Sequence, residues 1–376
     1  MVNASDAPSA TADAEAPRQV RRLAEDLAAC LTRPWTLMEV CGGQTHAIVR
    51  AGLDQLLPPG LRLIHGPGCP VCVTPSATID QALELARQPE VILCSYGDML
   101  RVPGSGRDDL LAVRAGGGDV RLLTSPLQAL DLALRHPDRQ VVFLAVGFET
   151  TAPATALLAR RTLAEGITNL SLLLAHVRVA PAMEAILADP DNGVQGFLAA
   201  GHVCAVIGTA ELQQLVDRWQ VPVVVSGFQP LELMTALLRA VELLEAGAPQ
   251  LANAYGSVVR PQGNPTAIAL LQEVFLSGDQ PWRGLGTLAG GGLSLRDPYT
   301  GLDARRRFGL QAPATASTDA SPSSETVCIA GSILRGRALP TDCPAFGLAC
   351  TPEHPLGAPM VSSEGACAAY FHYRAG

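Results

Sequence analysis

The chain has 376 residues, of which 48% are hydrophobic and 16% are charged, and its formal net charge is −8. This length exceeds that of one ordinary hydrophobic core and predicts two or three domains. The negative charge argues against binding to nucleic acid, and no apolar run approaches the roughly 18 residues that span a membrane. All 27 basic residues are arginine, which excludes a catalytic lysine and the lysine of a phosphate-binding P-loop.

Residues 1–25 begin "MVNASDAPSATADAEAP", and we expect them to form a disordered tail. This start carries acidic residues where a signal peptide needs basic ones, and it lacks an apolar stretch. We therefore expect a cytoplasmic protein. Ten cysteines in that compartment are expected to be reduced thiols, metal ligands or redox couples, since a framework of structural disulfides is typical of secreted chains.

Short β-rich apolar runs alternate with helical patterns from about residue 26 to 250. Because these runs are continuously apolar, they predict strands buried on both faces of a parallel sheet. Helical patterns between them, such as "SATIDQALELARQ" and "PLELMTALLRAVELLEAG", indicate an α/β protein with parallel sheets flanked by helices. The predicted strands are 35–40, 61–65, 90–96, 120–125, 141–148, 170–177, 196–203 and 221–228.

Eight strands exceed one small sheet, and we divide them into two similar lobes, 26–126 and 127–250, with a single large sheet as the alternative. After residue 250 the pattern changes: a helix is expected in "NPTAIALLQEVF", but "WRGLGTLAGGGLSLRD" is glycine-rich and poor in regular period. Residues 312–326 form a flexible, low-complexity segment. The C-terminal region, 251–376, has little apolar periodicity, so a metal centre is the natural source of its stability.

The cysteines fall into three groups. Cys30, Cys94 and Cys204 lie in apolar sequence, where free cysteine packs as a small hydrophobe. A C-terminal set offers the thiolates of either a structural zinc or a [4Fe-4S] cluster, and its wide spacing of 14, 6 and 16 residues fits a cluster held by loops better than paired zinc knuckles; it comprises Cys328, Cys343, Cys350 and Cys367.

The third group is Cys41, Cys69 and Cys72. Cys41 ends the first predicted strand and precedes Gly-Gly and a helix, whose N-terminus would lower the pKa of this thiol. Cys69 and Cys72 form a CxxC pair between a strand and a helix, as in thiol–disulfide oxidoreductases. The alternative is half of a zinc site completed by Cys41 and either His46 or His65. The sequence chemistry alone leaves these readings open.

Five stretches together resemble the HypD family of hydrogenase maturation proteins. They are "MEVCGGQTHAIVRAGLDQLLP", "HGPGCPVCVTP", "VGFETTAPATA", "AGHVCAVIGT" and "MVSSEGACAAYFHY". The resemblance extends from about residue 35 to 374. It implies two similar α/β lobes with a C-terminal iron–sulfur domain, and a role in assembling the active-site iron of [NiFe]-hydrogenases, which receives two cyanides and one carbon monoxide.

The resemblance also implies partners and residue roles. A HypC-type chaperone would share the iron with Cys41, and HypE, loaded by HypF, would deliver cyanide before transfer of the iron to the hydrogenase large subunit. Cys69 and Cys72 would be a redox pair near a [4Fe-4S] cluster held by the four C-terminal cysteines. His46 is a tentative iron ligand. Three residues of "GFETTAP" would line the central cleft: Glu149, Thr150 and Thr151.

Two positions depart from the family pattern. Gln44 stands where many members are expected to carry histidine, and Gln229 stands where a glutamate is common. We hypothesise a relay of electrons from an external reductant through the cluster and the CxxC pair to the iron at Cys41. Two rival functions are a stand-alone iron–sulfur thiol oxidoreductase acting on a small molecule and a zinc-containing interaction adaptor.

Overall fold

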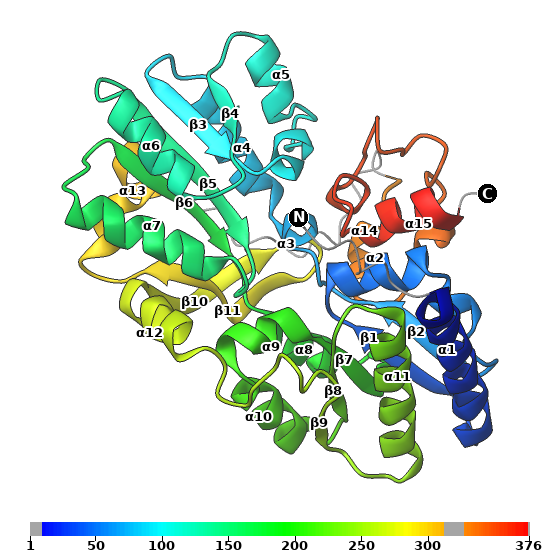
Figure 1. Cartoon of the computed structure of the whole chain (residues 1–376). Helices are drawn as coiled ribbons and strands as arrows, with labels where there is room; N and C mark the ends of the chain where they lie inside the picture. Colours follow the sequence, from blue (N-terminus) through cyan, green and yellow to red (C-terminus); the bar gives the residue numbers. More distant parts are fainter. Residues whose placement is uncertain (1–9, 312–326, 375–376) are drawn as a thin grey trace, which may run out of the picture.

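Two all-parallel sheets form the centre of the molecule (Figure 1). The structure, a computed structural model, describes residues 10–311 and 327–374, so the segment predicted to be flexible lies outside the described residues. Sheet A has the order β2 (Leu61–His65), β1 (Trp35–Glu39), β7 (Gly196–Ala200), β8 (Val223–Ser226) and β9 (Leu251–Asn253). Sheet B has the order β4 (Val120–Leu122), β3 (Val91–Ser95), β5 (Gln140–Gly147) and β6 (Leu170–His176).

Most of the strands are buried on both faces, as their continuous apolar runs predict, and the edge strands β4 and β9 are partly exposed. Every residue of β3, β6 and β7 is buried, and β5 pairs with β6 from Val141↔Leu170 to Gly147↔His176. Each of the eight predicted strands is present. The seventh is shorter than expected, because the chain turns into helix α9 (Gly201–Ile207) after Ala200.

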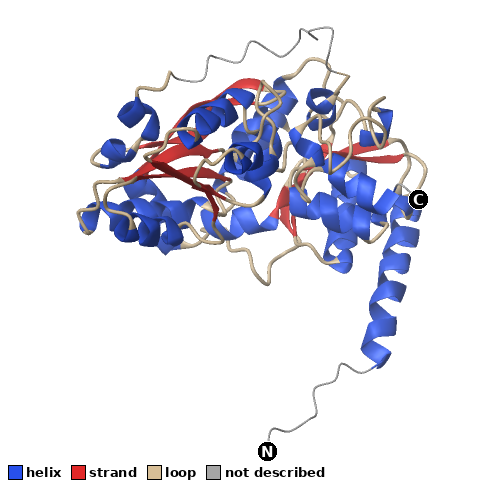
Figure 2. Ribbon diagram, turned by 90° about the horizontal axis from the view of Figure 1, so that it is seen from above, coloured by secondary structure: helices blue, strands red, loops and turns tan. Residues whose placement is uncertain are grey.

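Helices cover both faces of each sheet, which confirms the predicted α/β class (Figure 2). On sheet A, one face packs against α1 (Ala10–Cys30), α2 (Gly42–Arg50) and α11 (Pro230–Glu245), and the other against α8 (Val179–Ala188), α9 and α10 (Ala210–Trp219). On sheet B, one face packs against α4 (Ser76–Ala86), α5 (Leu110–Ala115) and α13 (Ala304–Phe308), and the other against α6 (Leu127–Arg135), α7 (Ala152–Ala164) and α12 (Pro265–Val274). No helix among the described residues has the length and apolar character to cross a membrane.

The strands are shared between the sheets differently from the predicted lobes 26–126 and 127–250. Sheet A combines β1 and β2 with β7, β8 and β9, while all four strands of sheet B come from residues 91–176. The chain therefore leaves sheet A after β2, completes sheet B, and returns. The predicted C-terminal region 251–376 is likewise divided, because β9 is the edge strand of sheet A and α12 packs on sheet B.

The predicted N-terminal tail is also corrected. Residues 10–25 belong to α1, a helix rich in alanine, glutamate and arginine, which are strong helix formers. Val20 and Leu27 are buried against α11. Packing of this apolar stripe stabilises a helix that composition alone would leave marginal.

The glycine-rich stretch that we predicted to lack a regular period forms a β-hairpin. Strands β10 (Phe275–Trp282) and β11 (Gly286–Leu295) pair antiparallel, and Gly292 bridges to Val177 at the end of β6. Trp282 is fully buried, and its Nε1–H donates to the carbonyl of Gly291 at 3.0 Å. The hairpin lies between the two sheets (Figure 1).

The remaining elements are short. They are the helices α3 (Pro70–Val73), α14 (Ala330–Leu334) and α15 (Ala366–Arg374), and the 3-10 helices η1 (Leu53–Gln55), η2 (Asp98–Arg101), η3 (Tyr299–Leu302), η4 (Pro340–Asp342) and η5 (Ala358–Met360). The described part of the C-terminal region beyond Val327 thus consists mostly of loops.

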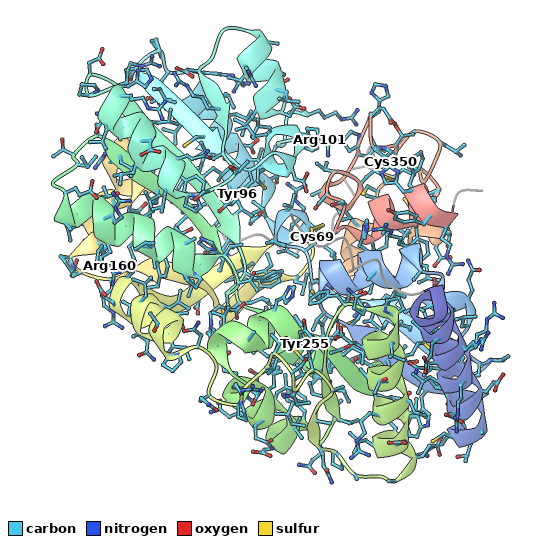
Figure 3. The ribbon with its side chains drawn as sticks, in the orientation of Figure 1. Cys69, Tyr96, Arg101, Arg160, Tyr255 and Cys350 are labelled. Carbon is cyan, nitrogen blue, oxygen red and sulfur yellow. A yellow bond between two sulfur atoms is a disulfide. The ribbon has the colours of Figure 1, made fainter. Side chains whose placement is uncertain are left out.

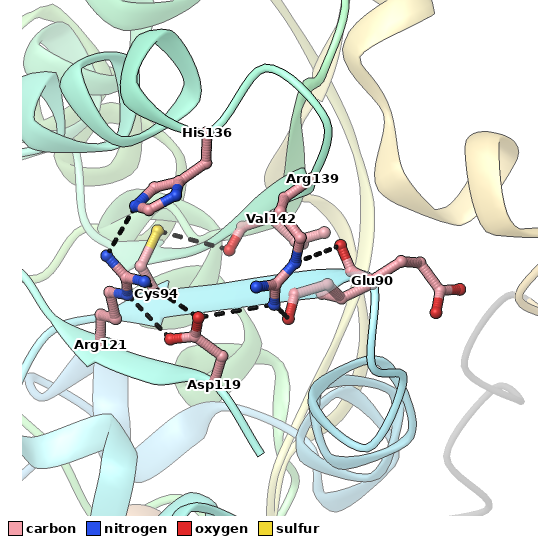
Figure 4. A network of polar contacts seen from close by, with 8 residues as sticks. Glu90, Cys94, Asp119, Arg121, His136, Arg139 and Val142 are labelled. Carbon is pink, nitrogen blue, oxygen red and sulfur yellow. Dashed lines mark hydrogen bonds and ion pairs between the residues drawn. The ribbon is translucent and has the colours of Figure 1, made fainter. Parts of the chain in front are cut away.

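The three cysteines expected in the core pack as predicted, although Cys30 is only half-buried. Cys204 is buried, and Cys94 lies on β3 with its Sγ 3.4 Å from the carbonyl oxygen of Val142. Beside it, Asp119 accepts two hydrogen bonds from Arg121 at the edge of sheet B (Figure 4). This network lies at the start of β4 and has a structural role.

Candidate functional site

The carboxyl ends of strands from both sheets face one cleft, which is where α/β folds place their binding sites. Residues directly after β1, β7 and β8 line it from sheet A, and residues after β3, β5 and β6 line it from sheet B. The C-terminal segment 362–364 closes a third side. We call this space of about 570 Å³ the central cleft; its lining includes Cys41, Gly68, Tyr96, Asp98, Thr150, Thr151, His202, Phe228 and Glu364.

Cys41 is the thiol of this cleft. It follows β1, caps the start of α2, and its backbone N–H donates to Oε2 of Glu39 at 2.9 Å. Burial raises the pKa of the Cys41 thiol to about 12, and the nearby charges of Glu39 and Glu364 act in the same direction. The backbone N–H of Gln44 lowers this pKa by less than burial raises it. The helix N-terminus therefore lowers the pKa as predicted, but the expected net preference for the thiolate is wrong for the protein without bound metal.

Glycines let the backbone close tightly around Cys41. A Cβ on Gly68 would lie 2.3 Å from the backbone nitrogen of Cys41, and the N–H of Gly42 donates to the carbonyl of Gly68 at 2.8 Å. A Cβ on Gly42 would lie 2.6 Å from Cβ of Glu364. The Gly-Gly and Gly-Pro-Gly turns thus allow the Cys41 turn, the CxxC loop and the C-terminal segment to meet.

Cys69 and Cys72 form a disulfide next to this turn. Pro70 begins α3, and Sγ of Cys69 accepts a hydrogen bond from the N–H of Cys72 at 3.1 Å. Both cysteines are buried, near the middle of the molecule where Figure 3 labels Cys69. Their neighbours Gly68, Pro70 and Val71 line the central cleft, so the disulfide lies directly behind its wall. His65, the alternative zinc ligand, instead contacts Glu39 and Tyr370.

The four C-terminal cysteines converge. Together they line one small cavity that is otherwise apolar, and it includes Phe346 and Met360 (Figure 3 labels Cys350). Burial raises the pKa of the Cys367 thiol, and the charges of the other three act in the same direction, which places all four within electrostatic reach. Gly357 gives the site room, because a Cβ there would lie 2.9 Å from Sγ of Cys328.

This donor set fits an iron–sulfur cluster, which is held by four cysteine thiolates. Leu356 adds a backbone N–H that donates to Sγ of Cys350 at 3.3 Å, as the sulfurs of such centres require. Among the described residues, no group of three or more histidine, cysteine or acidic side chains is arranged to hold a metal ion, so the fit rests on the type of the four donors and on their shared cavity.

Arg283 lies between the disulfide and the four-cysteine cavity. Its backbone N–H donates to Val73 at 2.7 Å and its Nε donates to Thr74 at 2.8 Å, both at the end of α3. Its positive charge lowers the pKa of the Cys328 thiol, although burial raises that pKa more. One side chain of the hairpin thus contacts the CxxC helix and acts on a C-terminal cysteine.

Two of the three predicted "GFETTAP" residues line the cleft. Thr150 and Thr151 are exposed in it, whereas Glu149 is buried behind the wall, where its Oε1 accepts from the N–H of Val179 at 3.0 Å. Its Oε2 has no hydrogen-bond partner among the described residues. Burial raises the pKa of Glu149 to about 7.

The structure gives His46 other contacts. Its Nδ1 lies 3.1 Å from the carbonyl of Ser363 and its Nε2 3.4 Å from the hydroxyl of Tyr373, and it is absent from the described lining of the cleft. Gln44 is buried and donates to the carbonyls of Ala199 and Ser226, which fixes α2 to the ends of β7 and β8.

Gln229 caps α11. Its backbone N–H donates to Glu232 Oε2 at 3.1 Å, in a reciprocal capping box. Gln229, where the sequence analysis expects a glutamate in many members, thus closes the start of α11 by exchanging hydrogen bonds with Glu232.

Sequence reasoning missed several residues of the cleft. His202 stacks on Phe228 with ring centroids 4.0 Å apart, and partial burial lowers its pKa. Glu364 is exposed by surface area, yet the cleft walls desolvate it and raise its pKa, as does the charge of Asp98. Both His202 and Glu364 lie in the stretches that carry the family resemblance, and this position was the one sign in the sequence that they belong to the site.

The fold and site define an α/β protein with two parallel sheets, a thiol-containing cleft between their carboxyl ends, and a buried disulfide beside a four-cysteine cavity. The model of the family HypD, described as "Hydrogenase formation hypA family", matches residues 17–374. The chain belongs to this HypD family of hydrogenase maturation factors.

Relatives cover nearly the whole chain. It is 47% identical over 347 residues to "Hydrogenase maturation factor HypD" of Azotobacter vinelandii, which covers 91% of this chain and 90% of the relative. It is 43% identical over 356 residues to the protein of that name from Rhodobacter capsulatus, with 94% and 93% covered. It is 43% identical over 372 residues to that of Escherichia coli (strain K12), with 96% of each covered.

Proposed function

We propose that this chain is the scaffold on which the iron of [NiFe]-hydrogenases receives two cyanides and one carbon monoxide. The observation that carries the proposal is the position of Cys41, a half-buried thiol at the carboxyl end of β1 in a cleft between two sheets. Low-spin iron with strong-field ligands favours soft thiolate donors. Only Cys41 among the described cysteines lines this cleft, so it is the residue that binds the iron as cargo.

Cys41 supplies one sulfur, and the rest of the cleft stays open for other ligands. Thr150, Thr151 and Ser363 are exposed along its walls. A HypC-type chaperone that contributes a second thiolate enters here and shares the iron. HypE, loaded by HypF, brings cyanide to the same opening, and the completed iron passes to the hydrogenase large subunit.

Binding of iron displaces a proton from Cys41. The pKa of this thiol is raised to about 12, so the free protein holds it as S–H at neutral pH. A metal ligand must be deprotonated, and metal affinity at such a site rises with pH. The raised pKa keeps the thiolate fraction of Cys41 small until iron arrives.

Cys69 and Cys72 act as a two-electron store. Reduction of their disulfide takes two electrons and two protons and yields two thiols; reoxidation returns the electrons to whatever accepts them in the cleft. Reductive release of cyanide from a thiocyanate group on HypE consumes two electrons, breaks the S–C bond and leaves a thiolate and cyanide. The electrons come from an external reductant.

The four C-terminal cysteines hold a [4Fe-4S] cluster, which supplies one-electron transfer when bound. The chain's own residues exclude water from this site, because Phe346, Met360 and Ile333 line the cavity with the thiols. Arg283 fixes the adjacent α3 through Val73 and Thr74.

The test is anaerobic purification of the chain together with its HypC-type chaperone, followed by infrared spectra in the cyanide and carbonyl stretching region. We expect wild type to show both sets of bands and Cys41→Ser to lose them while keeping iron–sulfur absorption. Cys30→Ser is the control, because Cys30 is half-buried at the end of α1. Undiminished bands in Cys41→Ser contradict the proposal.

The role of the disulfide is tested separately with Cys69→Ser. We expect the iron to bind and the cyanide bands to be lost, since Cys41 remains in place but the dithiol is absent. Unchanged cyanide loading in this variant removes the redox role.

The buried disulfide beside a cleft also fits a stand-alone thiol oxidoreductase acting on a small molecule. That function predicts turnover by the purified chain without partners, whereas the scaffold needs them. Turnover of a small disulfide or thiocyanate by the chain alone decides for the oxidoreductase.

A further inference from the structure

A buried carboxylate lies directly beneath the Cys41 turn. Glu39 ends β1 and is fully buried. Its Oε2 accepts the backbone N–H of Cys41 at 2.9 Å, and its Oε1 accepts from Nδ1 of His65 at 2.8 Å and from the hydroxyl of Thr45. Burying a carboxylate is costly unless it is hydrogen-bonded, and both oxygens of Glu39 are occupied.

The contacts continue from His65 to the C-terminal helix. His65 ends β2, and its Nε2 lies 3.1 Å from the hydroxyl of Tyr370 on α15. The rings of the two residues meet edge to face with centroids 5.4 Å apart. The tautomer of His65 that carries its proton on Nδ1 donates to Glu39, and its Nε2 then accepts from the hydroxyl of Tyr370. Every donor in this series of hydrogen bonds then has its acceptor.

This series of hydrogen bonds joins two cysteine sites that are far apart in sequence. Tyr370 lies three residues after Cys367, about one turn along α15, and Cys367 is one of the four cysteines of the C-terminal cavity. At the other end, the acceptor for the N–H of Cys41 is a side chain, because the backbone turns away from β7 at this point. The path from Tyr370 to Cys41 contains only His65 and Glu39.

Other contacts hold α15 against the same elements, and they do not reach Cys41. Arg374 pairs with Asp54 beyond α2, and His46 contacts the carbonyl of Ser363. These contacts dock the helix. Glu39 is the side chain that accepts a hydrogen bond from Cys41, whereas Glu364, which precedes α15, approaches Gly42 in the same turn.

We propose that Glu39, His65 and Tyr370 are positioning residues that fix the Cys41 turn through the docked C-terminal helix. The inference rests on the proposed function in taking Cys41 as the iron ligand. It adds that the geometry of this ligand depends on the segment that carries Cys367. Disturbance of α15 loosens Cys41, and a well-formed C-terminal site makes the cleft ready for iron.

The test uses Tyr370→Phe in the full chain purified anaerobically without partners. This change removes one hydroxyl and keeps the ring. We measure the rate at which iodoacetamide alkylates Cys41, by mass spectrometry of its peptide, and expect an increase of about fivefold, the factor that loss of one typical buried hydrogen bond gives. The matched control is Tyr299→Phe, since Tyr299 is also buried and its hydroxyl donates to Glu273 on α12.

A double-mutant cycle distinguishes the loss of this series of hydrogen bonds from a general loss of packing. If the residues act as one chain, His65→Gln and His65→Gln/Tyr370→Phe alkylate at the same rate, because the first change already breaks the path. Additive effects, or a rate for Tyr370→Phe equal to that of wild type, overturn the proposal. Iron–sulfur absorption and the unfolding midpoint of each variant show that α15 remains folded.

The outcome is independent of the proposed function. Alkylation of cargo-free Cys41 reports the position of the turn even where no cyanide or carbonyl bands form. In the complex with the chaperone, Tyr370→Phe is expected to shift and broaden those bands, because the iron ligand is less fixed; Tyr299→Phe leaves them unchanged. Absence of bands in wild type counts against the scaffold, and unchanged alkylation counts against the positioning chain.

Discussion

Gly68 occupies a point where no other residue fits. A Cβ there would lie 2.3 Å from the backbone nitrogen of Cys41 and 2.5 Å from its Cα, and neither backbone atom can move away without moving β1. We expect Gly68→Ala to lower the free energy of unfolding by about 1–3 kcal/mol, as overpacking does. Gly106→Ala is the control, because no described atom lies within 4 Å of a Cβ there. Denaturant unfolding of both variants checks the prediction; equal midpoints contradict it.

Glu149 gives a pH dependence with a definite sign. Burial raises its pKa in the folded protein to about 7, above the ordinary 4.5, so the folded state keeps a proton that the unfolded chain loses. The free energy of unfolding therefore falls as pH rises from about 4.5 to about 7, and Glu149 contributes about 1–3 kcal/mol to that fall. We expect Glu149→Gln to remove this part of the slope.

The measurement is urea unfolding of wild type and variant between pH 5 and 8. Glu84→Gln is the control, because Glu84 is exposed on α4. A variant whose stability falls as steeply as that of wild type would show that Glu149 is ionised in the folded protein.

The local sequence predicted where Cys41 lies and could not predict the pKa of its thiol. Its place after a strand and before Gly-Gly follows from apolar pattern and turn chemistry. The direction of its pKa depends on burial and on Glu364, which is more than 300 residues away in the chain and meets Gly42 only in the fold. Electrostatics at a site between elements depends on tertiary packing.

At the scale of elements, the β10–β11 hairpin is expected to matter most for stability and for the surroundings of the disulfide. Trp282 is fully buried, contacts Phe148 with ring centroids 6.0 Å apart, and belongs to the core that contains the disulfide. We expect Trp282→Ala to cost about 3–5 kcal/mol of stability. Trp219→Ala, a change at a partly buried tryptophan of α10, is expected to cost less.

Thermal and denaturant unfolding check this prediction, and the thiol content of the folded variant adds a second readout. We expect the Cys69–Cys72 disulfide of Trp282→Ala to be reduced faster by a small thiol, because the cavity left by the indole opens its surroundings. Equal reduction rates in Trp282→Ala and Trp219→Ala would mean that the packing of the hairpin does not protect the disulfide.

Strands with continuous apolar runs were predictable, and the hairpin was not. All eight predicted strands are present, and they could be predicted because burial leaves continuous apolar runs in the sequence. The glycines of β11 serve a different need: a Cβ on Gly292 would lie 2.6 Å from Cβ of Gln280 and 3.0 Å from the carbonyl of His176. Close packing against β6 selects glycine there, which looks like an irregular loop in sequence.

At the scale of the whole molecule, the C-terminal region connects with sheet B through Arg101. Its Nη2 donates to the carbonyl of Val361 at 2.7 Å, directly before the segment that closes the cleft (Figure 3 labels Arg101). We expect Arg101→Ala to speed amide hydrogen exchange in residues 358–364 by about tenfold, the effect of one hydrogen bond to a charged donor. Exchange in β5 and β6 should stay unchanged.

The control for this change is Arg337→Ala, which removes the pair with Asp189 on the sheet A side of the same region. We expect it to leave exchange at 358–364 unaffected. Equal protection of this segment in wild type and Arg101→Ala would mean that the cleft wall is held by packing alone.

The division into two lobes was predictable in kind, because the eight predicted strands exceed one small sheet, but the assignment of strands to each was wrong. Strand pairing depends on partners distant in the chain: β1 pairs with β2, its sequence neighbour, and also with β7, which follows all of sheet B. No local pattern in residues 35–40 records that second partner. In the described part of the chain, the strands could be predicted one by one from local sequence, but their order within the sheets does not follow their order in the chain.

This interleaving determines when the proposed iron site can form during synthesis. The ribosome releases Cys41 early. Leu37, in the preceding strand β1, cannot pair with Gly196 of β7 until all of sheet B has emerged, and Glu364 comes almost last. Domains of this kind fold only after their late strands emerge, since long-range pairing is slow. A growing polypeptide thus presents no finished cleft, and a prematurely terminated one lacks the wall formed by residues 362–364. Under the proposed function, only molecules that include this late segment could receive the iron.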